Sequence, residues 1–186
     1  LMLLSCGYAD RHRNSSSCEQ ALVDSLEVRV QDSLFSNVHY SRSQLLEALT
    51  QTQDSLVYYR LLALYGKTFF VSSDFDSILY YNRRVKEFSR NASQSSESLQ
   101  SPRWNDVLSD VYNIEGNVWM QLNRPDSAII DYKKAYGYRL EGKKLHLLPD
   151  ICINIADAYL HRSDLAHTAS YYRRALFLCD SLNLSE

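Results

Sequence analysis

The sequence predicts an all-α protein built from repeated pairs of antiparallel helices. Gly and Pro are scarce, with 5 and 3 in 186 residues, so the turns of a β-rich fold lack their usual residues. Apolar residues recur at helical spacing along most of the chain. A short phrase also appears three times, as YYNRRV at 80–85, DYKKAY at 131–136 and YYRRAL at 171–176.

These three phrases occupy equivalent positions of a longer repeat. Their basic pairs begin at Arg83, Lys133 and Arg173, so the second interval is shorter than the first. Self-similarity in a constant register is typical of repeat proteins, in which each unit packs on its neighbours. Small or branched residues recur at the same two intervals in three further sets: Gly66, Gly116 and Ala156; Ile78, Ala128 and Thr168; and Val85, Ala135 and Ala175.

Composition limits the class of protein. The chain is long enough for one domain with a continuous core. Hydrophobic residues make up 45% and charged residues 23%, which is usual for a soluble globular protein. The net charge of −2 argues against a nucleic-acid-binding surface, which normally carries a basic excess.

Residues 1–17 are expected to lie outside the helical repeats. The opening LMLLSCG resembles the end of a bacterial signal peptide with its lipobox, followed by a Ser-rich tether at 13–17. On this interpretation Cys6 is lipidated and holds the chain at a membrane. The alternative is an apolar N-terminus with an incidental cysteine. Because the chain begins without Met, we expect that residues precede it.

The next part of the chain is predicted to contain the first helices. Residues 18–53 are assigned to N-terminal helices, in which SRSQLLEAL at 41–49 forms a degenerate half-repeat. Residues 54–90 are the first full unit, with the turn SSDFDS between its two helices. The acids of SDFD at 73–76 are explained as helix-start residues, where the helix dipole favours Asp. Residues 91–101 are a polar loop.

Two further units complete the array. In residues 102–140, Ser101 is expected to cap a helix that begins with Pro102, and Pro125 begins the second helix. In residues 147–182, Pro149 begins the first helix, and Ser163 or Asp164 caps the second.

Small residues are expected where helices cross. Gly116, Ala128 and Ala135 would let two backbones approach closely, and a bulky side chain at Gly116 would cost about 1–3 kcal/mol. The basic pairs are expected on the opposite, solvated side of each second helix, although a functional basic stripe is an alternative. Cys152 and Cys179 are expected to be free, buried thiols.

This pattern resembles the tetratricopeptide repeat (TPR), over roughly residues 54–180. The second unit matches five signature positions and the third unit matches four, with Thr168 in place of a small Ala. In the first unit Gly66 and Phe69 fit, whereas Ile78, Asn82 and Val85 depart from the pattern. The resemblance implies a right-handed α-solenoid, although the period exceeds the usual length of about 34 residues. The matching residues of the second and third units are Gly116, Trp119, Ala128, Tyr132 and Ala135, then Ala156, Tyr159, Tyr172 and Ala175.

No catalytic chemistry is predicted. The sequence has no HExxH, no glycine-rich phosphate loop, no GxSxG and no Cys/His cluster with zinc spacing. His161 and His167 are six residues apart across a predicted turn, which does not suit a metal pair on one helix face. We therefore expect no enzyme activity, cofactor or metal in this segment.

TPR arrays bind extended peptides or partner helices in a groove lined by their first helices, so the resemblance implies such a groove here. Asn113 and Asn117 are four residues apart and can hold a peptide backbone through two amides, and Asn154 extends their row. The alternative is that all these residues belong to an ordinary solvated face. The mixed charge does not resemble the basic carboxylate clamp of TPR co-chaperones. The full set is Arg60, Lys67, Asp110, Asn113, Asn117, Met120, Asp150, Asn154, Asp157 and His161.

The expected function is protein–protein interaction. The long units and the Leu-Leu-Ser-Cys start are similar to TPR lipoproteins and TPR sensor proteins of Bacteroidetes. The first hypothesis is a non-enzymatic scaffold, lipid-anchored in the cell envelope and facing the periplasm. The alternative is the sensory input region of a membrane signalling or transcription regulator. An enzyme is compatible only with chemistry beyond Glu186, and the apolar C-terminal helix leads us to expect that the chain continues there.

Overall fold

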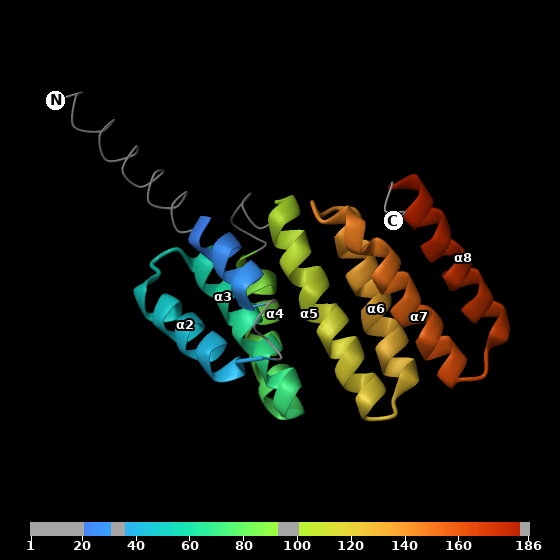
Figure 1. Ribbon diagram of the computed structural model, residues 1–186, viewed down its shortest axis with the longest axis horizontal. Coiled ribbons are helices and arrows are strands. Elements are labelled where there is room, and N and C mark those ends of the chain that lie inside the picture. Colours follow the sequence, from blue (N-terminus) through green and yellow to red (C-terminus); the bar gives the residue numbers. More distant parts are fainter. Residues whose placement is uncertain (1–20, 31–35, 93–100, 183–186) are drawn as a thin grey trace, which may run out of the picture. The chain divides into compact units, whose positions relative to one another are not determined.

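The computed structural model describes residues 21–30, 36–92 and 101–182, and every regular element in these ranges is helical (Figure 1). The prediction of an all-α fold is therefore confirmed for this part of the chain. Cys6, the tether at 13–17 and most of the predicted loop at 91–101 lie outside the described residues. After the helical segment 21–30, the α-helices are α2 (Val38–Gln51), α3 (Ser55–Lys67), α4 (Phe75–Ala92), α5 (Pro102–Gln121), α6 (Pro125–Leu140), α7 (Leu148–His161) and α8 (Leu165–Ser181), with short 3-10 helices η1 (Thr68–Ser72) and η3 (Leu145–Leu147).

The chain forms two compact units, residues 1–81 and residues 82–186, and the boundary falls inside α4. In the first unit, segment 21–30, α2 and α3 share one core. Asn37 and Asp54 begin the two helices, because their side chains accept hydrogen bonds from backbone N–H groups of the first turns. The residues of this core are Val23, Leu26, Val30, Leu45, Ala48, Val57 and Leu61.

In the second unit, α5 packs against α6, α6 against α7, and α7 against α8. Successive helices run in opposite directions (Figure 1). The predicted helix starts are confirmed, since Ser101 accepts a hydrogen bond from Trp104 N and proline occupies the first turn of α5, α6 and α7. Of the two candidates for the cap of α8, Asp164 is the one that accepts, from His167 N.

One turn geometry recurs between the two helices of each of the three repeats. The residue that follows the first helix has a positive φ angle in every case: 53° at Ser73, 55° at Asn123 and 59° at Ser163. These three residues are separated by the same two intervals as the repeated phrases. In each turn the N–H of the following residue donates to a carbonyl five residues back, as in a Schellman motif that ends a helix. These bonds join Asp74 to Phe69, Arg124 to Trp119 and Asp164 to Tyr159, at 3.1, 2.8 and 3.0 Å.

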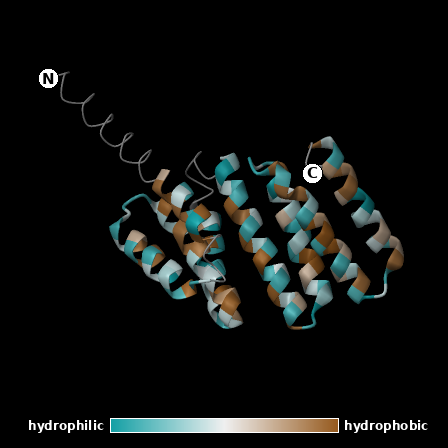
Figure 2. Cartoon of the chain, in the orientation of Figure 1, coloured by the Kyte–Doolittle hydropathy of each residue, from teal (hydrophilic) through white to brown (hydrophobic). Residues whose placement is uncertain are grey.

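The distribution of polarity follows from this packing. Hydrophobic and hydrophilic residues alternate along the helices (Figure 2). The first residue of each repeated basic pair is exposed, as are Lys134 and Arg174, while Arg84 is half-buried. These side chains still contact the array: Lys133 donates to the Tyr159 hydroxyl at 2.9 Å. The predicted solvated face is therefore partly used for packing on aromatic rings.

Candidate functional site

Two of the predicted asparagines meet between the first helices of the second unit. Asn113 lies on α5 and Asn154 on α7, and both are half-buried. The Asn154 Nδ2 donates to the Asn113 Oδ1 at 3.0 Å. This bond joins residues 41 positions apart in sequence, so it depends on the packing of the two helix pairs. We call Asn113, Asn117 and Asn154 the asparagine face.

The asparagine face retains hydrogen-bonding capacity. A primary amide has two N–H donors and an oxygen that accepts two hydrogen bonds. Among the described residues, the Asn113 Nδ2 and the Asn154 Oδ1 have no hydrogen-bond partner beyond the bond that joins the two amides. Asn117 uses its Oδ1 to accept from the Tyr132 hydroxyl at 2.7 Å, which leaves its Nδ2 available. One face thus offers both donors and acceptors.

The acidic residues of the predicted groove are less available than the sequence suggests. Asp110, with its side chain 41% exposed, is ion-paired with the Arg139 guanidinium. Asp157 accepts a hydrogen bond from the Tyr172 hydroxyl. That bond raises the pKa of Tyr172, because the carboxylate favours the protonated phenol. Both acids therefore contribute first to the packing of second helices on first helices.

The remaining predicted residues of the second unit have different surroundings. Asp150, in the first turn of α7, and His161, its last residue, are exposed. Met120 is partly buried and packs against the core formed by α6 and α7. Of these three, Asp150 and His161 remain accessible to a ligand.

The prediction that Arg60 lines the groove is wrong. Arg60 is 7% exposed and lies in the first unit, where its Nη2 is 2.7 Å from Asp24 Oδ1 and 3.7 Å from Glu27 Oε2. A buried guanidinium held by two carboxylates stabilises the first unit and cannot contact a ligand. Lys67, the last residue of α3, belongs to the same unit and is half-buried.

Gly116 has a different role from the one predicted. A Cβ built on Gly116 would overlap the ring of Tyr132, so the glycine makes room for an aromatic side chain and not for a close approach of two backbones. Tyr132 is 2% exposed. Burial, followed by the nearby charge of Asp157, raises its pKa, so the phenol stays protonated and donates to Asn117.

The same contacts recur in successive helix pairs, a feature that sequence reasoning missed. The bond from Tyr132 to Asn117 in the α5–α6 pair corresponds to the bond from Tyr172 to Asp157 in the α7–α8 pair. A second contact links residues 12 positions apart in all three repeats. Phe69 stacks on Tyr81, and Tyr159 stacks on Tyr171. At the equivalent positions of the middle repeat, Trp119 Nε1 donates to Asp131 Oδ2 at 2.8 Å. The sequence signal was the constant separation of these pairs within the register.

A buried ion cluster was also missed. Asp106 is 4% exposed and accepts from the Arg139 Nη1 at 2.8 Å. It also accepts from the backbone N–H groups of Lys143 and Lys144, at 3.0 and 3.2 Å. One carboxylate therefore joins α5, α6 and the connection that leads to α7. Nothing in the repeat pattern indicates it, because Asp106 lies outside the recurring positions.

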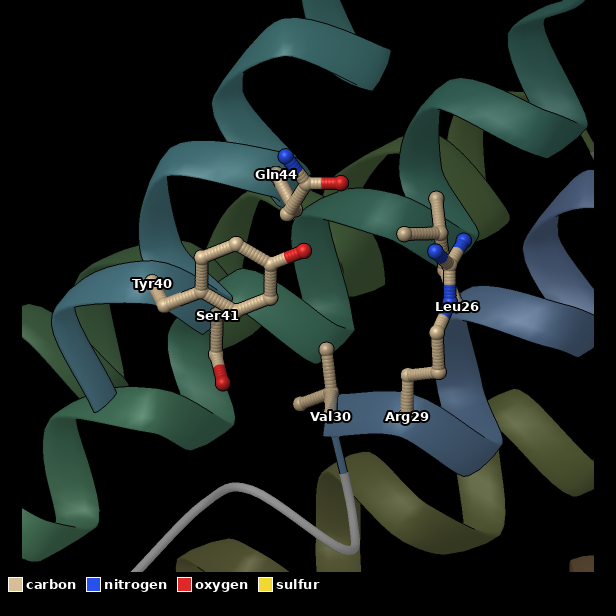
Figure 3. Close-up of a pocket in the computed structure, with 6 residues that line it drawn as sticks. All are labelled: Leu26, Arg29, Val30, Tyr40, Ser41 and Gln44. Carbon is tan, nitrogen blue, oxygen red and sulfur yellow. The ribbon is translucent and has the colours of Figure 1, made fainter. Parts of the chain in front are cut away.

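The hollow drawn in Figure 3 lies in the first unit, between segment 21–30 and α2. Its volume is about 10 Å³, which is room for about one water molecule. Such a volume is too small for a cofactor. Its lining residues are Leu26, Arg29, Val30, Tyr40, Ser41 and Gln44.

Two other kinds of site, a metal centre and a membrane-spanning helix, are absent from the parts of the chain that the structure describes. In the described ranges, no three His, Cys, Asp or Glu side chains gather as the ligands of a metal would. Within those ranges, no helix has the combined length and hydropathy that crossing a bilayer requires. Cys152 is buried, and burial raises the pKa of its thiol to about 11, which makes it a poor nucleophile.

Comparison with known proteins identifies no family for this chain. No protein-family profile matches the chain, and no curated protein matches it either. A solved structure, BtubC (BKLC) from P. vanneervenii, is similar with a TM-score of 0.45 and 15% identity, over 97% of this chain and 87% of that chain. Similarity at this level supports no conclusion about fold or function.

Proposed function

We propose that the helix pairs form a right-handed, TPR-like α-solenoid that binds an extended peptide or a partner helix without catalysis. Three recurring features support the solenoid: the left-handed turn residues, the tyrosine bonds to Asn117 and Asp157, and the contacts between residues 12 apart. Each recurs at the spacing of the repeated phrases. Equivalent side chains with equivalent contacts are what stacked repeats require.

The single observation that carries the binding proposal is the hydrogen bond between Asn113 and Asn154. It orients two amides from different helices, so that one retains donors and the other an acceptor. A peptide group needs the same combination, one acceptor for its N–H and one donor for its C=O. Holding the amides in place before the ligand arrives reduces the entropy lost on binding.

The charge near the asparagine face indicates which peptides suit it. Asp150 is exposed at the start of α7, and Asp110 is partly exposed on α5 despite its bond to Arg139. A basic peptide would be attracted to these carboxylates, and a neutral peptide would be neither attracted nor repelled. An acidic peptide would be repelled.

The experiment is a selection of random peptides displayed on phage against the whole chain, followed by titration of the enriched peptides. Removing both amides, in the variant Asn113→Ala with Asn154→Ala, should weaken binding about tenfold, because two hydrogen bonds contribute roughly 0.5–1.5 kcal/mol each. Ser170→Ala, an exposed change on α8, is the matched control and should leave affinity unchanged.

Two outcomes would exclude this site. One is that no peptide is enriched over a selection against an unrelated helical protein. The other is that enriched peptides bind the double variant as tightly as the original chain.

We also propose that Cys6 is lipidated and holds the protein at the periplasmic face of the cell envelope. The support is the Leu-Leu-Ser-Cys sequence alone. Multiple acyl chains would make such anchoring firm, whereas a single chain anchors weakly. Labelling of cells with a radioactive fatty acid should mark the protein and fail to mark Cys6→Ser. Equal labelling of both would exclude the anchor.

A further inference from the structure

The second half of α4 is held against α5 by polar side chains. Three residues of α4, at intervals of four and three positions, lie on one stripe of the helix, and each is hydrogen-bonded to α5. We call this row of contacts the polar joint. Its bonds run from Asn82 Nδ2 to Val111 O at 3.2 Å, from Lys86 Nζ to Glu115 Oε2 at 2.6 Å, and from Trp104 Nε1 to Ser89 Oγ at 3.1 Å.

The groups of the polar joint are removed from water. Asn82 is 0% exposed, and Trp104 and Glu115 are 2% and 4% exposed. Among the described residues, Asn82 Oδ1 has no hydrogen-bond partner. A buried acceptor without a partner loses its hydrogen bonds to water, and this loss opposes the bond that the same amide makes to Val111.

The ion pair of the polar joint also contributes little to the attachment of α4. Burial raises the pKa of Glu115 above its ordinary value, although the bond to Lys86 acts in the opposite direction. Two charged groups of α6 also face this carboxylate: Asp131 adds to the rise, and Lys134 opposes it. The unfavourable effects of burial and Asp131 therefore exceed the attraction to the two lysines.

The next contact of the same kind in the array is apolar. In the register of the basic pairs, three residues of the polar joint have equivalents that belong to the core shared by α6 and α7 or pack against it. Polar side chains thus occupy positions at which the following contact between a second helix and a first helix is apolar. The correspondences are Asn82 with Tyr132, Lys86 with Tyr136, and Glu115 with Ile155.

We propose that the polar joint is a hinge, at which residues 82–92 of α4 separate from α5 by local opening while α5 to α8 remain folded. In a repeat array each helix is stabilised mainly by its neighbours, so the helix with the weakest contact opens first. The boundary between the two compact units falls at Asn82, the first residue of the joint.

Separation of this segment also unfolds it. An isolated helix shorter than about 12–15 residues is marginal in water, and residues 82–92 are fewer. The opening therefore exposes the backbone amides of the segment, together with the stripe of α5 that carries Trp104, Val111 and Glu115.

The test is native-state hydrogen exchange of the whole chain in low concentrations of urea, followed by NMR. The amides of residues 84–88 are compared with those of residues 134–138, their equivalents in α6. Residues 84–88 lie further from the end of their helix, so fraying does not favour their exchange. We expect their protection factors to be at least about tenfold lower and to depend less on urea, because local opening exposes less surface than global unfolding does.

Asn82→Leu replaces the amide by two methyl groups in the same arrangement and removes the unpartnered acceptor. It should raise the protection of residues 84–88 about tenfold and change that of residues 134–138 less than about twofold. Asn91→Leu, the same change at an exposed position of α4, is the matched control and should alter both by less than about twofold.

A second variant tests the ion pair. Lys86→Met with Glu115→Leu makes this contact apolar, as it is at Tyr136 and Ile155, and should also raise the protection of residues 84–88 about tenfold. Circular dichroism reports whether each variant keeps its helix content, and where one variant loses it, the other decides. The proposal is overturned if residues 84–88 and 134–138 are equally protected in the original chain. It is also overturned if an apolar variant with full helix content lowers the protection of residues 84–88, because the polar contacts would then be what holds α4 in place.

Discussion

At the scale of single residues, Gly116 of α5 and Gly137 of α6 have opposite environments. Gly116 faces the buried ring of Tyr132, whereas a Cβ on Gly137 would meet no atom within 4 Å. Both are helical, so neither is needed for an unusual backbone angle. Replacing each glycine by alanine therefore measures two different effects: the loss of packing space at Gly116 and the gain in intrinsic helix propensity at Gly137.

We expect Gly116→Ala to destabilise the protein by about 1–3 kcal/mol, because the methyl group must displace a ring that is packed and hydrogen-bonded. Gly137→Ala should stabilise it by about 0.5–1 kcal/mol, because alanine favours the helix and nothing opposes it. Urea unfolding followed by circular dichroism measures both. Equal effects of the two changes would refute this assignment of Gly116.

At the scale of elements, the recurring turn contains residues in a backbone conformation that is costly for them. Ser163 has a φ of 59°, in the left-handed region that glycine adopts without strain. Asn123, with a φ of 55°, tolerates this region better than serine does. The turns therefore have different amounts of strain to relieve.

Ser163→Gly should raise the free energy of unfolding by roughly 0.5–1 kcal/mol, and Asn123→Gly should raise it by less. The matched control is Ser170→Gly in the interior of α8, which should lower it by roughly 0.5–1 kcal/mol. Thermal unfolding of the three variants gives the comparison. A loss of stability in Ser163→Gly would show that the turn is not strained.

The start of α8 adds a dependence on pH. Asp164 accepts from His167 N at 3.2 Å, and this bond, with the His167 side chain, lowers the pKa of Asp164 below 3.8. The folded chain thus binds fewer protons near that pH than the unfolded chain does. The contribution of Asp164 is complete above about pH 3.8 and is lost as the pH falls through the folded value.

Asn caps a helix about as well as Asp but does not titrate. We therefore expect the melting temperature of Asp164→Asn to fall less than that of the original chain between about pH 6 and about pH 3. Differential scanning calorimetry at the two pH values is the measurement. Parallel losses in both proteins would mean that other carboxylates cause the acid sensitivity.

At the scale of the whole molecule, the second unit depends on a charge pair that is almost inaccessible to water. Arg139 and Asp106 have side chains that are 1% and 6% exposed. Removing one member would leave the other charge buried without its partner, at a cost of about 3–5 kcal/mol. We expect this loss for Arg139→Met, measured by urea unfolding.

Adding Asp106→Asn to Arg139→Met should restore part of this loss. The neutral amide has no buried charge, and its oxygen can still accept from the backbone of Lys143 or Lys144. A double variant no more stable than Arg139→Met alone would contradict this account of the pair.

The helices could be predicted from the sequence because their signals are local. Apolar spacing, a capping serine and prolines in first turns act within a few residues, and Ser101 and Pro125 were assigned from them. The register of the repeat also placed the buried Ala128 and Ala135 correctly.

The failures concern pairs that are distant in sequence. Arg60 was assigned to a groove from its position in the repeat. That position does not show its ion pairs, because Asp24 and Glu27 lie on a helical segment much earlier in the chain. Asp106 and Arg139 are 33 residues apart and belong to no repeated phrase. Of the candidate site, the sequence indicated Asn113 and Asn154 but not their mutual bond. Such contacts depend on how helices pack, which local pattern does not specify.

The bonds from Asp106 to the backbone have a consequence for proteolysis. Lys143-Lys144 is a dibasic sequence in a connection between helices, and surface connections of this kind are usual sites of tryptic cleavage. A protease must draw several residues into its active site in an extended form, and here two successive amides are held by a buried carboxylate. Cleavage after Lys143 or Lys144 therefore requires local unfolding around Asp106. The rate of cleavage should depend on the free energy of that local unfolding, although the dibasic sequence itself suits the protease.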